Sequence, residues 1–502
     1  MTIVFNEARV FRLILICRDK SNMTANHFIS LSRSLFTKSL VFWLVMILCM
    51  ITAQTPFAES QSVNKEISKS TLDKHHFSSD AGVMVLRLQS GKILFESSSD
   101  KLLAPASLMK LVTSWSALTE LGPDFSVSTL FNGELGSSPG VLRRLVITGG
   151  GAPDVTSESL YIIASLFRRR GIHQIDEIVV DTSRFKGGPQ IRGERAYEAG
   201  SSSLLLNFNA VGVEVCPAQS VGTLAQSALE PAEYGRVIKG EVRTVPGSGN
   251  NINLHIPSGN GNIRIDGAIG INAQCRTVYR SVPEPEVYFA QTLVGFLQSV
   301  KHPLDELDKS VIRVSASPID TSKMKFFQEY RSKPLVAFVA DMNTFSNNVI
   351  AEQLVHLVGK EDEMFDYERG RARMNEVIKN TFKSEVVIRD GSGLNRENRL
   401  SASLLAHLIR SAILSPQFGV EFERSLAVTG RTGTLSSRKF SIPPYHLRAK
   451  TGSLTGVNAL AGTLVPYSGE KIVFAIIQNS TKSRSRALEE ERRFLESLYK
   501  NY

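Results

Sequence analysis

The sequence is poor in cysteine and has no obvious set of metal ligands. Its four cysteines and nine histidines form neither a His-Glu-x-x-His pattern nor a Cys/His group at zinc spacing. Internal repeats and low-complexity tracts are also missing, and the longest apolar run, residues 40–51, falls short of the ~20 residues that span a bilayer. We therefore expect no metal centre, no cofactor and no repeat architecture.

Composition points to a globular protein of more than one unit. Apolar residues make up 42% and charged residues 21% of 502 residues, which is typical of folded domains. Of 58 basic and 48 acidic side chains, six and two lie in residues 1–58, so the remainder carries 52 against 46, a net charge of +6. Such a balance suits an anionic surface such as a cell-wall polymer. It lacks the clustered basic residues of a nucleic-acid-binding protein.

The N-terminal residues have the pattern of a secretory signal peptide. A basic stretch up to residue 38 precedes the apolar run of residues 40–51, and small residues follow. We expect cleavage near Ala58 or Ala53, with Met23 as an alternative start. Retention as an uncleaved anchor is the other interpretation. The expected location is periplasmic or otherwise extracytoplasmic, with at most peripheral membrane association.

Two cysteines lie within this leader, and Cys216 and Cys275 remain after it. An exported protein can join such a pair in a disulfide that closes a long loop. Two free thiols are the alternative.

A candidate nucleophile lies in the stretch Ala104-Pro105-Ala106-Ser107-Leu108-Met109-Lys110-Leu111. Pro105 suits a helix start, and apolar residues then recur at three- and four-residue steps. On that helix Ser107 and Lys110 would share one face. A lysine can take the serine proton only if burial or another cation lowers its pKa.

The Ser-x-x-Lys spacing alone is weak, because Ser62/Lys65, Ser322/Lys325 and Ser436/Lys439 share it. Two further motifs follow downstream, Ser346-Asn347-Asn348 and the single Lys450-Thr451-Gly452. Ser-x-x-Lys, Ser-x-Asn and Lys-Thr-Gly in this order are the signature of penicillin-binding proteins and class A β-lactamases.

The 239 residues between Ser107 and Ser346 indicate an inserted module. Short strand-like runs separated by turn residues predict that it is β-rich. These runs cover residues 142–148, 175–181, 204–215, 237–245 and 252–265. Outside it we predict a hairpin at 82–96 before the Ser107 helix. After it we predict helices at 349–355, 361–379, 401–414 and 484–499, and strands at 386–388, around Lys450, at 460–465 and at 471–477.

The chain resembles the class C low-molecular-mass penicillin-binding proteins, the D-alanyl-D-alanine carboxypeptidase/endopeptidase family. Besides the three motifs, shared segments include Asp181-Thr182-Ser183-Arg184-Phe185, Leu206-Asn207-Phe208-Asn209, Asp390-Gly391-Ser392-Gly393-Leu394, Gly433-Thr434-Leu435 and Arg448-Ala449-Lys450-Thr451-Gly452-Ser453-Leu454-Thr455-Gly456. The resemblance implies an α/β (α+β) fold with a transpeptidase/β-lactamase-like catalytic domain, residues 59–133 and 318–502, interrupted by a β-rich accessory insertion, residues 134–317. The sequence departs from the family pattern at Gly150-Gly151-Ala152-Pro153-Asp154-Val155-Thr156, which lies in the insertion and outside the catalytic motifs, and at Gly430-Arg431-Thr432-Gly433.

The resemblance also implies an activity and the residues that carry it. A serine DD-peptidase of this family acts on peptidoglycan stem peptides and is trapped by β-lactam antibiotics. Ser107 would be the nucleophile and Lys110 its base, with Lys450 lowering the pKa of Lys110. Ser346 would relay a proton to the leaving amine, and Asn348 would bind the substrate amide. Lys450 and Thr451, with Gly452 and Ser453 beside them, would recognise the terminal carboxylate, and the N–H groups of Ser107 and Ser453 would form an oxyanion hole.

Two other functions fit the same motifs. A β-lactamase shares the first step but needs a base to hydrolyse the ester, and no glutamate lies in a recognisable motif for it. A binding protein on a disused peptidase fold is the second, since a fold does not guarantee activity.

Overall fold

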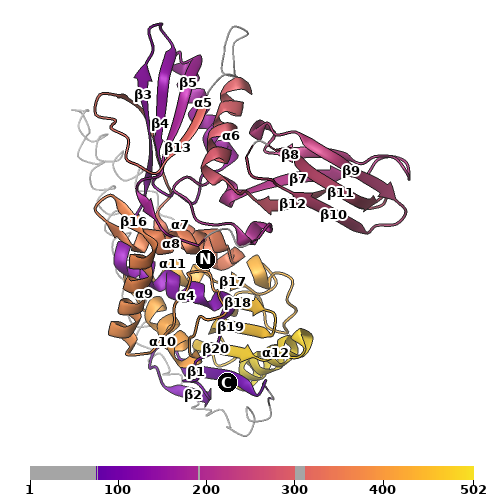
Figure 1. The fold of residues 1–502 in the computed structure, drawn as a ribbon. Helices are drawn as coiled ribbons and strands as arrows, with labels where there is room; N and C mark the ends of the chain where they lie inside the picture. Colours follow the sequence, from indigo (N-terminus) through magenta and orange to yellow (C-terminus); the bar gives the residue numbers. More distant parts are fainter. Residues whose placement is uncertain (1–74, 76, 190–192, 260, 300–310) are drawn as a thin grey trace, which may run out of the picture. The chain divides into compact units, whose positions relative to one another are not determined.

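The computed structural model describes residues 75, 77–189, 193–259, 261–299 and 311–502, all within the compact unit Glu66–Tyr502 (Figure 1). The signal peptide predicted for residues 1–58, and its anchor alternative, lie outside these residues. In the described part of the chain, no helix has the length and apolar character needed to cross a membrane.

A six-stranded antiparallel sheet is the centre of the catalytic region, in the order β17-β18-β19-β20-β1-β2. The predicted hairpin forms β1 and β2, and the Lys450 strand is β18. The strands of the six-stranded sheet are β1 Asp80–Arg87, β2 Ile93–Ser97, β17 Ala427–Val428, β18 Leu447–Leu454, β19 Val457–Leu464 and β20 Ile472–Asn479.

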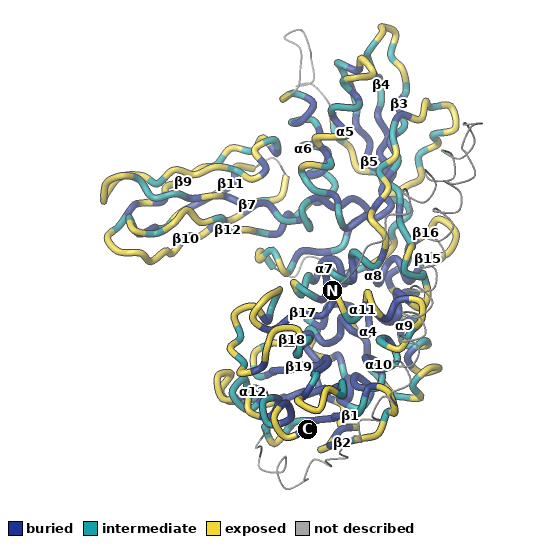
Figure 2. The backbone as a smooth tube through the Cα atoms, turned by 180° about the vertical axis from the view of Figure 1, so that it is seen from behind, coloured by how far each residue is buried: buried dark blue, intermediate teal, exposed yellow. Residues whose placement is uncertain are grey.

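Helices cover both faces of this sheet because its central strands are apolar on both. In β20, Val473, Ala475 and Ile477 join the core beneath helix α10 (Ala402–Ile413), whereas the alternating residues Phe474 and Ile476 join a second core with helix α12 (Arg484–Asn501). This alternation is the two-residue period of a strand buried on both sides. The dark blue tube at β19 in Figure 2 shows this burial.

Several helices of the catalytic region pack around the helix that follows the nucleophile. This helix is α4, and it contacts α7, α8, α9 and α10. The bounds are η3 Ala106–Leu108, α4 Met109–Leu121, α7 Leu335–Phe345, α8 Asn348–Val358, α9 Tyr367–Phe382, α11 Gly419–Ser425 and η8 Gly433–Leu435. Asn347 and Ser401 cap α8 and α10 by accepting a backbone N–H.

Two local predictions in this region are wrong. The helix predicted from residue 361 begins at Tyr367, because the chain first forms a hairpin of β15 (Lys360–Glu361) and β16 (Met364–Asp366) and Asp366 then caps α9. Residues 386–388 form no strand, since Val387 makes only an isolated bridge with Arg399.

The insertion contains a five-stranded sheet in the order β13-β5-β4-β3-β14. Its strands are β3 Ser128–Leu135, β4 Val141–Thr148, β5 Gln174–Asp181, β13 Val311–Ser315 and β14 Lys325–Arg331. Helices α5 (Ser157–Arg169) and α6 (Pro285–Ser299) pack together and contact this sheet, so the module is mixed α/β here rather than only β-rich. Because β3 and β14 reach beyond residues 134–317, we propose junctions near residues 127 and 332.

Two three-stranded sheets complete the insertion, in the orders β12-β7-β8 and β10-β11-β9. The strands of these two sheets are β7 Ala210–Cys216, β8 Gln226–Glu230, β9 Ile238–Val245, β10 Asn250–His255, β11 Ile263–Gly270 and β12 Arg276–Ser281. The shorter elements of the insertion are β6 Phe185–Lys186 and the 3₁₀ turns η4 Ala196–Glu198, η5 Asn207–Asn209 and η6 Ala232–Tyr234. The strand predicted at 204–215 starts only at Ala210, because residues 207–209 have positive φ angles. Short strand β6 pairs with β16 of the catalytic region.

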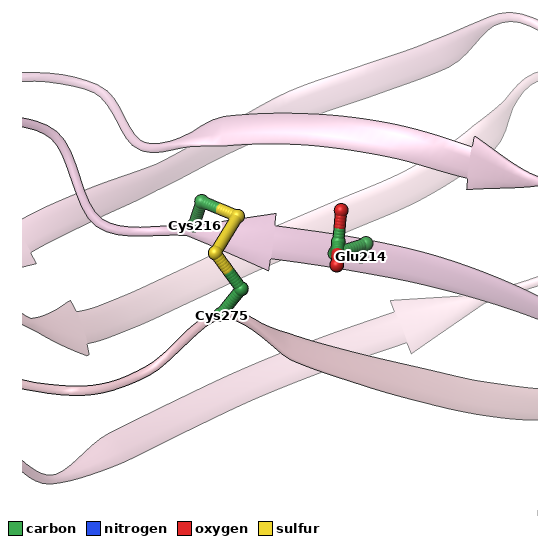
Figure 3. A group of neighbouring side chains, drawn as sticks. All are labelled: Glu214, Cys216 and Cys275. Carbon is green, nitrogen blue, oxygen red and sulfur yellow. A yellow bond between two sulfur atoms is a disulfide. The ribbon is translucent and has the colours of Figure 1, made fainter.

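A disulfide joins Cys216 at the end of β7 to Cys275 just before β12 (Figure 3). It resolves the two alternatives for this pair. Its Cα atoms are 4.1 Å apart, and the bond ties together the two ends of neighbouring antiparallel strands.

Candidate active site

Ser107 lies in a tight turn between the hairpin and α4. The predicted helix start is a single 3₁₀ turn, Ala106–Leu108, and the α-helix follows at Met109. Ala106 has a φ of 48°, an uncommon conformation for a residue with a side chain. Neighbouring glycines allow close packing around this turn: a side chain at Gly393 would clash with the Ala106 carbonyl, and one at Gly452 would lie 2.8 Å from the Pro105 carbonyl oxygen.

Lys110 lies one turn after Ser107, fully buried, whereas Ser107 is partly exposed. Its Nζ is 3.1 Å from Ser107 Oγ, 2.6 Å from Asn348 Oδ1 and 2.6 Å from the Ser392 carbonyl oxygen. The structure thus brings the first two sequence motifs into direct contact. Ser392 belongs to the Asp390–Leu394 turn, which the sequence did not mark as part of the site.

Burial lowers the pKa of Lys110 from its ordinary value to about 7. The nearby carboxylates of Glu352 and Asp390 act in the opposite direction and raise it. Both are buried, at 3% and 0% exposure. A lysine with a pKa near 7 is neutral in a large fraction of molecules at physiological pH.

Ser346 and Asn348 lie in the short connection between α7 and α8. Ser346 ends α7 with a left-handed backbone, φ 60°, and Asn348 begins α8. Asn348 is held at both ends of its amide, because Oδ1 accepts from Lys110 and Nδ2 donates to the Tyr197 carbonyl oxygen of the insertion at 2.8 Å.

Lys450 reaches the same site from β18. Its Nζ donates to Ser346 Oγ at 2.8 Å and to the Thr451 carbonyl oxygen at 2.9 Å. Burial lowers the pKa of Lys450 well below its ordinary value, and the charges of Lys110 and then Arg438 lower it further. Burial is the largest cause of the lowered pKa at both lysines. Because repulsion between two cations is mutual, the expectation that Lys450 lowers the pKa of Lys110 stays a prediction.

The three residues after Lys450 continue β18 along the site. Thr451 Oγ1 donates to Thr434 Oγ1 at 2.8 Å, which links the strand to the 3₁₀ turn η8. Gly452 lies against the nucleophile turn, as described above, and Ser453 is exposed.

A cavity of about 700 Å³ opens beside Ser346 and Asn348 and extends into the insertion. The charged side chains among its described lining residues are Glu158 and Glu230, and aromatic rings from Tyr197, Tyr279 and Phe345 also line it. Phe345 is 66% exposed, immediately before Ser346.

Among the described residues, the group that comes closest to a metal-ligand arrangement is Glu214, Cys216 and Cys275 (Figure 3). The two sulfur atoms are bonded to each other, so they are not thiolate ligands. The Ser107 site uses amines, hydroxyls and amides instead.

Several known proteins are similar to this chain. A D-alanyl-D-alanine carboxypeptidase from Actinomadura sp. is 28% identical over 425 residues, which cover 80% of this chain and 77% of that protein. The crystal structure of penicillin binding protein 4 (dacB) from Haemophilus influenzae matches with a TM-score of 0.71 at 21% identity, over 86% of this chain and all of that one. A predatory peptidoglycan endopeptidase from Bdellovibrio bacteriovorus matches with a TM-score of 0.51 at 16% identity, over 85% and 93%.

These structural matches support the fold, a transpeptidase-like α/β domain with an accessory insertion. The model of the family described as D-Ala-D-Ala carboxypeptidase 3 (S13) matches residues 63–499, which include every residue of the site and the whole insertion. The chain therefore belongs to the D-Ala-D-Ala carboxypeptidase (S13) family.

Proposed function

We propose that this protein is a serine DD-peptidase that removes the terminal D-alanine of peptidoglycan stem peptides through a Ser107 acyl-enzyme, and that it also cuts peptide cross-links. The observation that carries this proposal is the buried amine of Lys110, placed 3.1 Å from the hydroxyl of a partly exposed serine. β-Lactams would acylate the same serine. Its substrate places it outside the cytoplasm, and we propose the periplasm.

The contacts of Lys110 suit a neutral amine, which has two N–H donors and one lone pair. Asn348 Oδ1 and the Ser392 carbonyl oxygen can only accept hydrogen bonds, so they take the two N–H groups. The lone pair then faces Ser107, whose hydroxyl can donate. Lys110 is thus arranged to take the Ser107 proton as Oγ attacks the penultimate carbonyl.

The other predicted residues have complementary roles. Ser346, hydrogen-bonded to Lys450, would pass a proton to the leaving amine. Asn348 Nδ2 has one N–H left after bonding Tyr197, and this group would donate to the substrate amide. The N–H groups of Ser107 and Ser453 would stabilise the tetrahedral oxyanion by several kcal/mol. Water then hydrolyses the ester.

The terminal carboxylate of the substrate would bind Lys450 and Thr451, with Gly452 allowing its close approach. A carboxylate next to Lys450 favours the charged form of that lysine. Because the two lysines repel each other, this charge in turn favours the neutral form of Lys110. Substrate binding would therefore help to prepare the base.

The test of this function combines a substrate with an inhibitor. Purified protein should release D-alanine from a stem pentapeptide, and its intact mass should show one persistent penicilloyl adduct after incubation with benzylpenicillin. Rapid hydrolysis of the drug would instead indicate a β-lactamase. Neither an adduct nor D-alanine release would indicate a binding protein and refute the proposal.

The cavity beside Asn348 suggests which stem peptides are preferred. Because Glu158 and Glu230 are its charged lining residues, it would favour a substrate with a free amine near the scissile bond. We expect the double substitution Glu158→Gln/Glu230→Gln to raise KM several-fold for a peptide with a free side-chain amine. The control is the same peptide with its amine acetylated. Its KM should be higher than that of the free-amine peptide in the unsubstituted protein, and the two KM values should become similar in the double variant. Equal KM values for both peptides in the unsubstituted protein would contradict the assignment.

A further inference from the structure

Glu352 is a buried carboxylate that lies near the active site but in none of its motifs. It is on α8, one turn after Asn348, and is 3% exposed. Its Oε2 accepts from Tyr367 Oη at 2.5 Å and from Gly391 N at 3.1 Å, and its Oε1 accepts from Ser392 N at 3.1 Å. Burial, and after it the charge of Asp390, raise the pKa of Glu352, whereas the hydrogen bonds from these three donors act in the opposite direction and favour its ionised form.

These hydrogen bonds fix the turn that contacts the base. The N–H of Ser392 donates a hydrogen bond to Glu352, and the carbonyl oxygen of Ser392 accepts one from Lys110 Nζ at 2.6 Å. The preceding carbonyl, of Gly391, accepts from Thr113 Oγ1 at 2.7 Å. The turn is therefore held from α8 on one side and from α4 on the other.

We propose that Glu352 is a positioning residue, which holds the Ser392 carbonyl against Lys110 and thereby aims the lone pair of the amine at Ser107. This inference rests on the proposed function. Without Glu352, the carbonyl that takes one N–H of Lys110 would lose its fixed direction. The amine could then rotate away from Ser107.

The charge of Glu352 has a second effect, on the pH range of the reaction. The titratable groups that face Lys110 are Glu352 from α8, Asp390 from the turn and Lys450 from β18, with Arg438 acting on Lys450. Glu352 raises the pKa of Lys110 against the effect of burial. Loss of this charge should lower that pKa, so acylation should persist to lower pH.

The experiment measures acylation by benzylpenicillin from pH 5 to 9 in two substituted proteins. Glu352→Gln keeps the length of the side chain, but it leaves one acceptor oxygen in place of two and removes the negative charge. We expect its plateau rate to fall at least 10-fold and its acid limb to move to lower pH. Glu352→Asp keeps the charge but is too short to reach both N–H groups. Its plateau should fall while its acid limb stays in place.

Gln353→Leu is the matched control, because Gln353 is the next residue of α8, is also buried, and among the described residues its side chain hydrogen-bonds to the backbone of Ser202 and not to the Asp390 turn. It should show the plateau and acid limb of the unsubstituted protein. Rates are expressed per acylatable molecule, so partial unfolding does not affect them.

An unchanged plateau rate of acylation in Glu352→Gln would overturn the inference. A lower plateau rate whose acid limb stays at the same pH would overturn it as well. If Glu352→Gln does not fold, Tyr367→Phe provides the test, because it removes one of the three hydrogen-bond donors to the Glu352 carboxylate. We expect its acylation to be a few-fold slower, and an unchanged rate would refute the role of Glu352. If the unsubstituted protein neither acylates nor releases D-alanine, the proposed function is refuted instead.

Discussion

Replacement of Ser107 by alanine should abolish the penicilloyl adduct and the release of D-alanine. The Ser107 hydroxyl is the group that would form the acyl ester, and the other two hydrogen-bond partners described for Lys110 Nζ are an amide oxygen and a carbonyl oxygen. The measurement is intact mass after benzylpenicillin, followed over hours.

The fold should survive this change. Ser107 is partly exposed and loses one hydrogen bond, so we expect the free energy of unfolding to change by about 1 kcal/mol or less. Ser322→Ala is the control, because Ser322 has the same spacing to a lysine and both residues are exposed. It should acylate normally. A covalent adduct that persists in Ser107→Ala would place the nucleophile elsewhere.

The order of the three motifs predicted the fold, and it singled out Ser107 among the serines that have a lysine three residues later, which the spacing alone does not do. The pairs Ser322/Lys325 and Ser436/Lys439 match Ser107/Lys110 in sequence but are exposed. Burial of Lys110 depends on α8, β18 and the Asp390 turn, which come together only in the folded chain. Local sequence carries no signal for that difference.

Other features of the site lacked any such signal. Glu352 is 39 residues from Gly391, and a single acid within an apolar helix does not indicate a partner at that distance. The pairing between Asn348 and Tyr197 crosses from the catalytic region to the insertion. Helix α6 was missed because the turn residues around it favoured a strand interpretation, whereas β18 to β20 were predicted from their apolar character.

Replacement of Lys110 by alanine should slow acylation by a factor of about 10² to 10⁴, the usual contribution of a general base. This corresponds to about 3 to 5 kcal/mol of activation free energy. In this variant Ser107 stays in place, but without the Lys110 amine its hydroxyl must give its proton to water, which is a weaker base. The measurement is the second-order rate constant for benzylpenicillin, with Lys325→Ala as the exposed control of equal spacing.

The pH dependence distinguishes a base from a group that only fills space. With a pKa of about 7 for Lys110, acylation should rise through neutral pH and level off above it, because the neutral amine is the active form. Lys110→Ala should lose this inflection along with the rate. A small primary amine added to the solution should restore part of the rate, since the substitution opens a cavity lined by the acceptors of Asn348 and Ser392. Normal acylation by Lys110→Ala, with the inflection retained, would remove Lys110 from the mechanism and assign the proton transfer to another group.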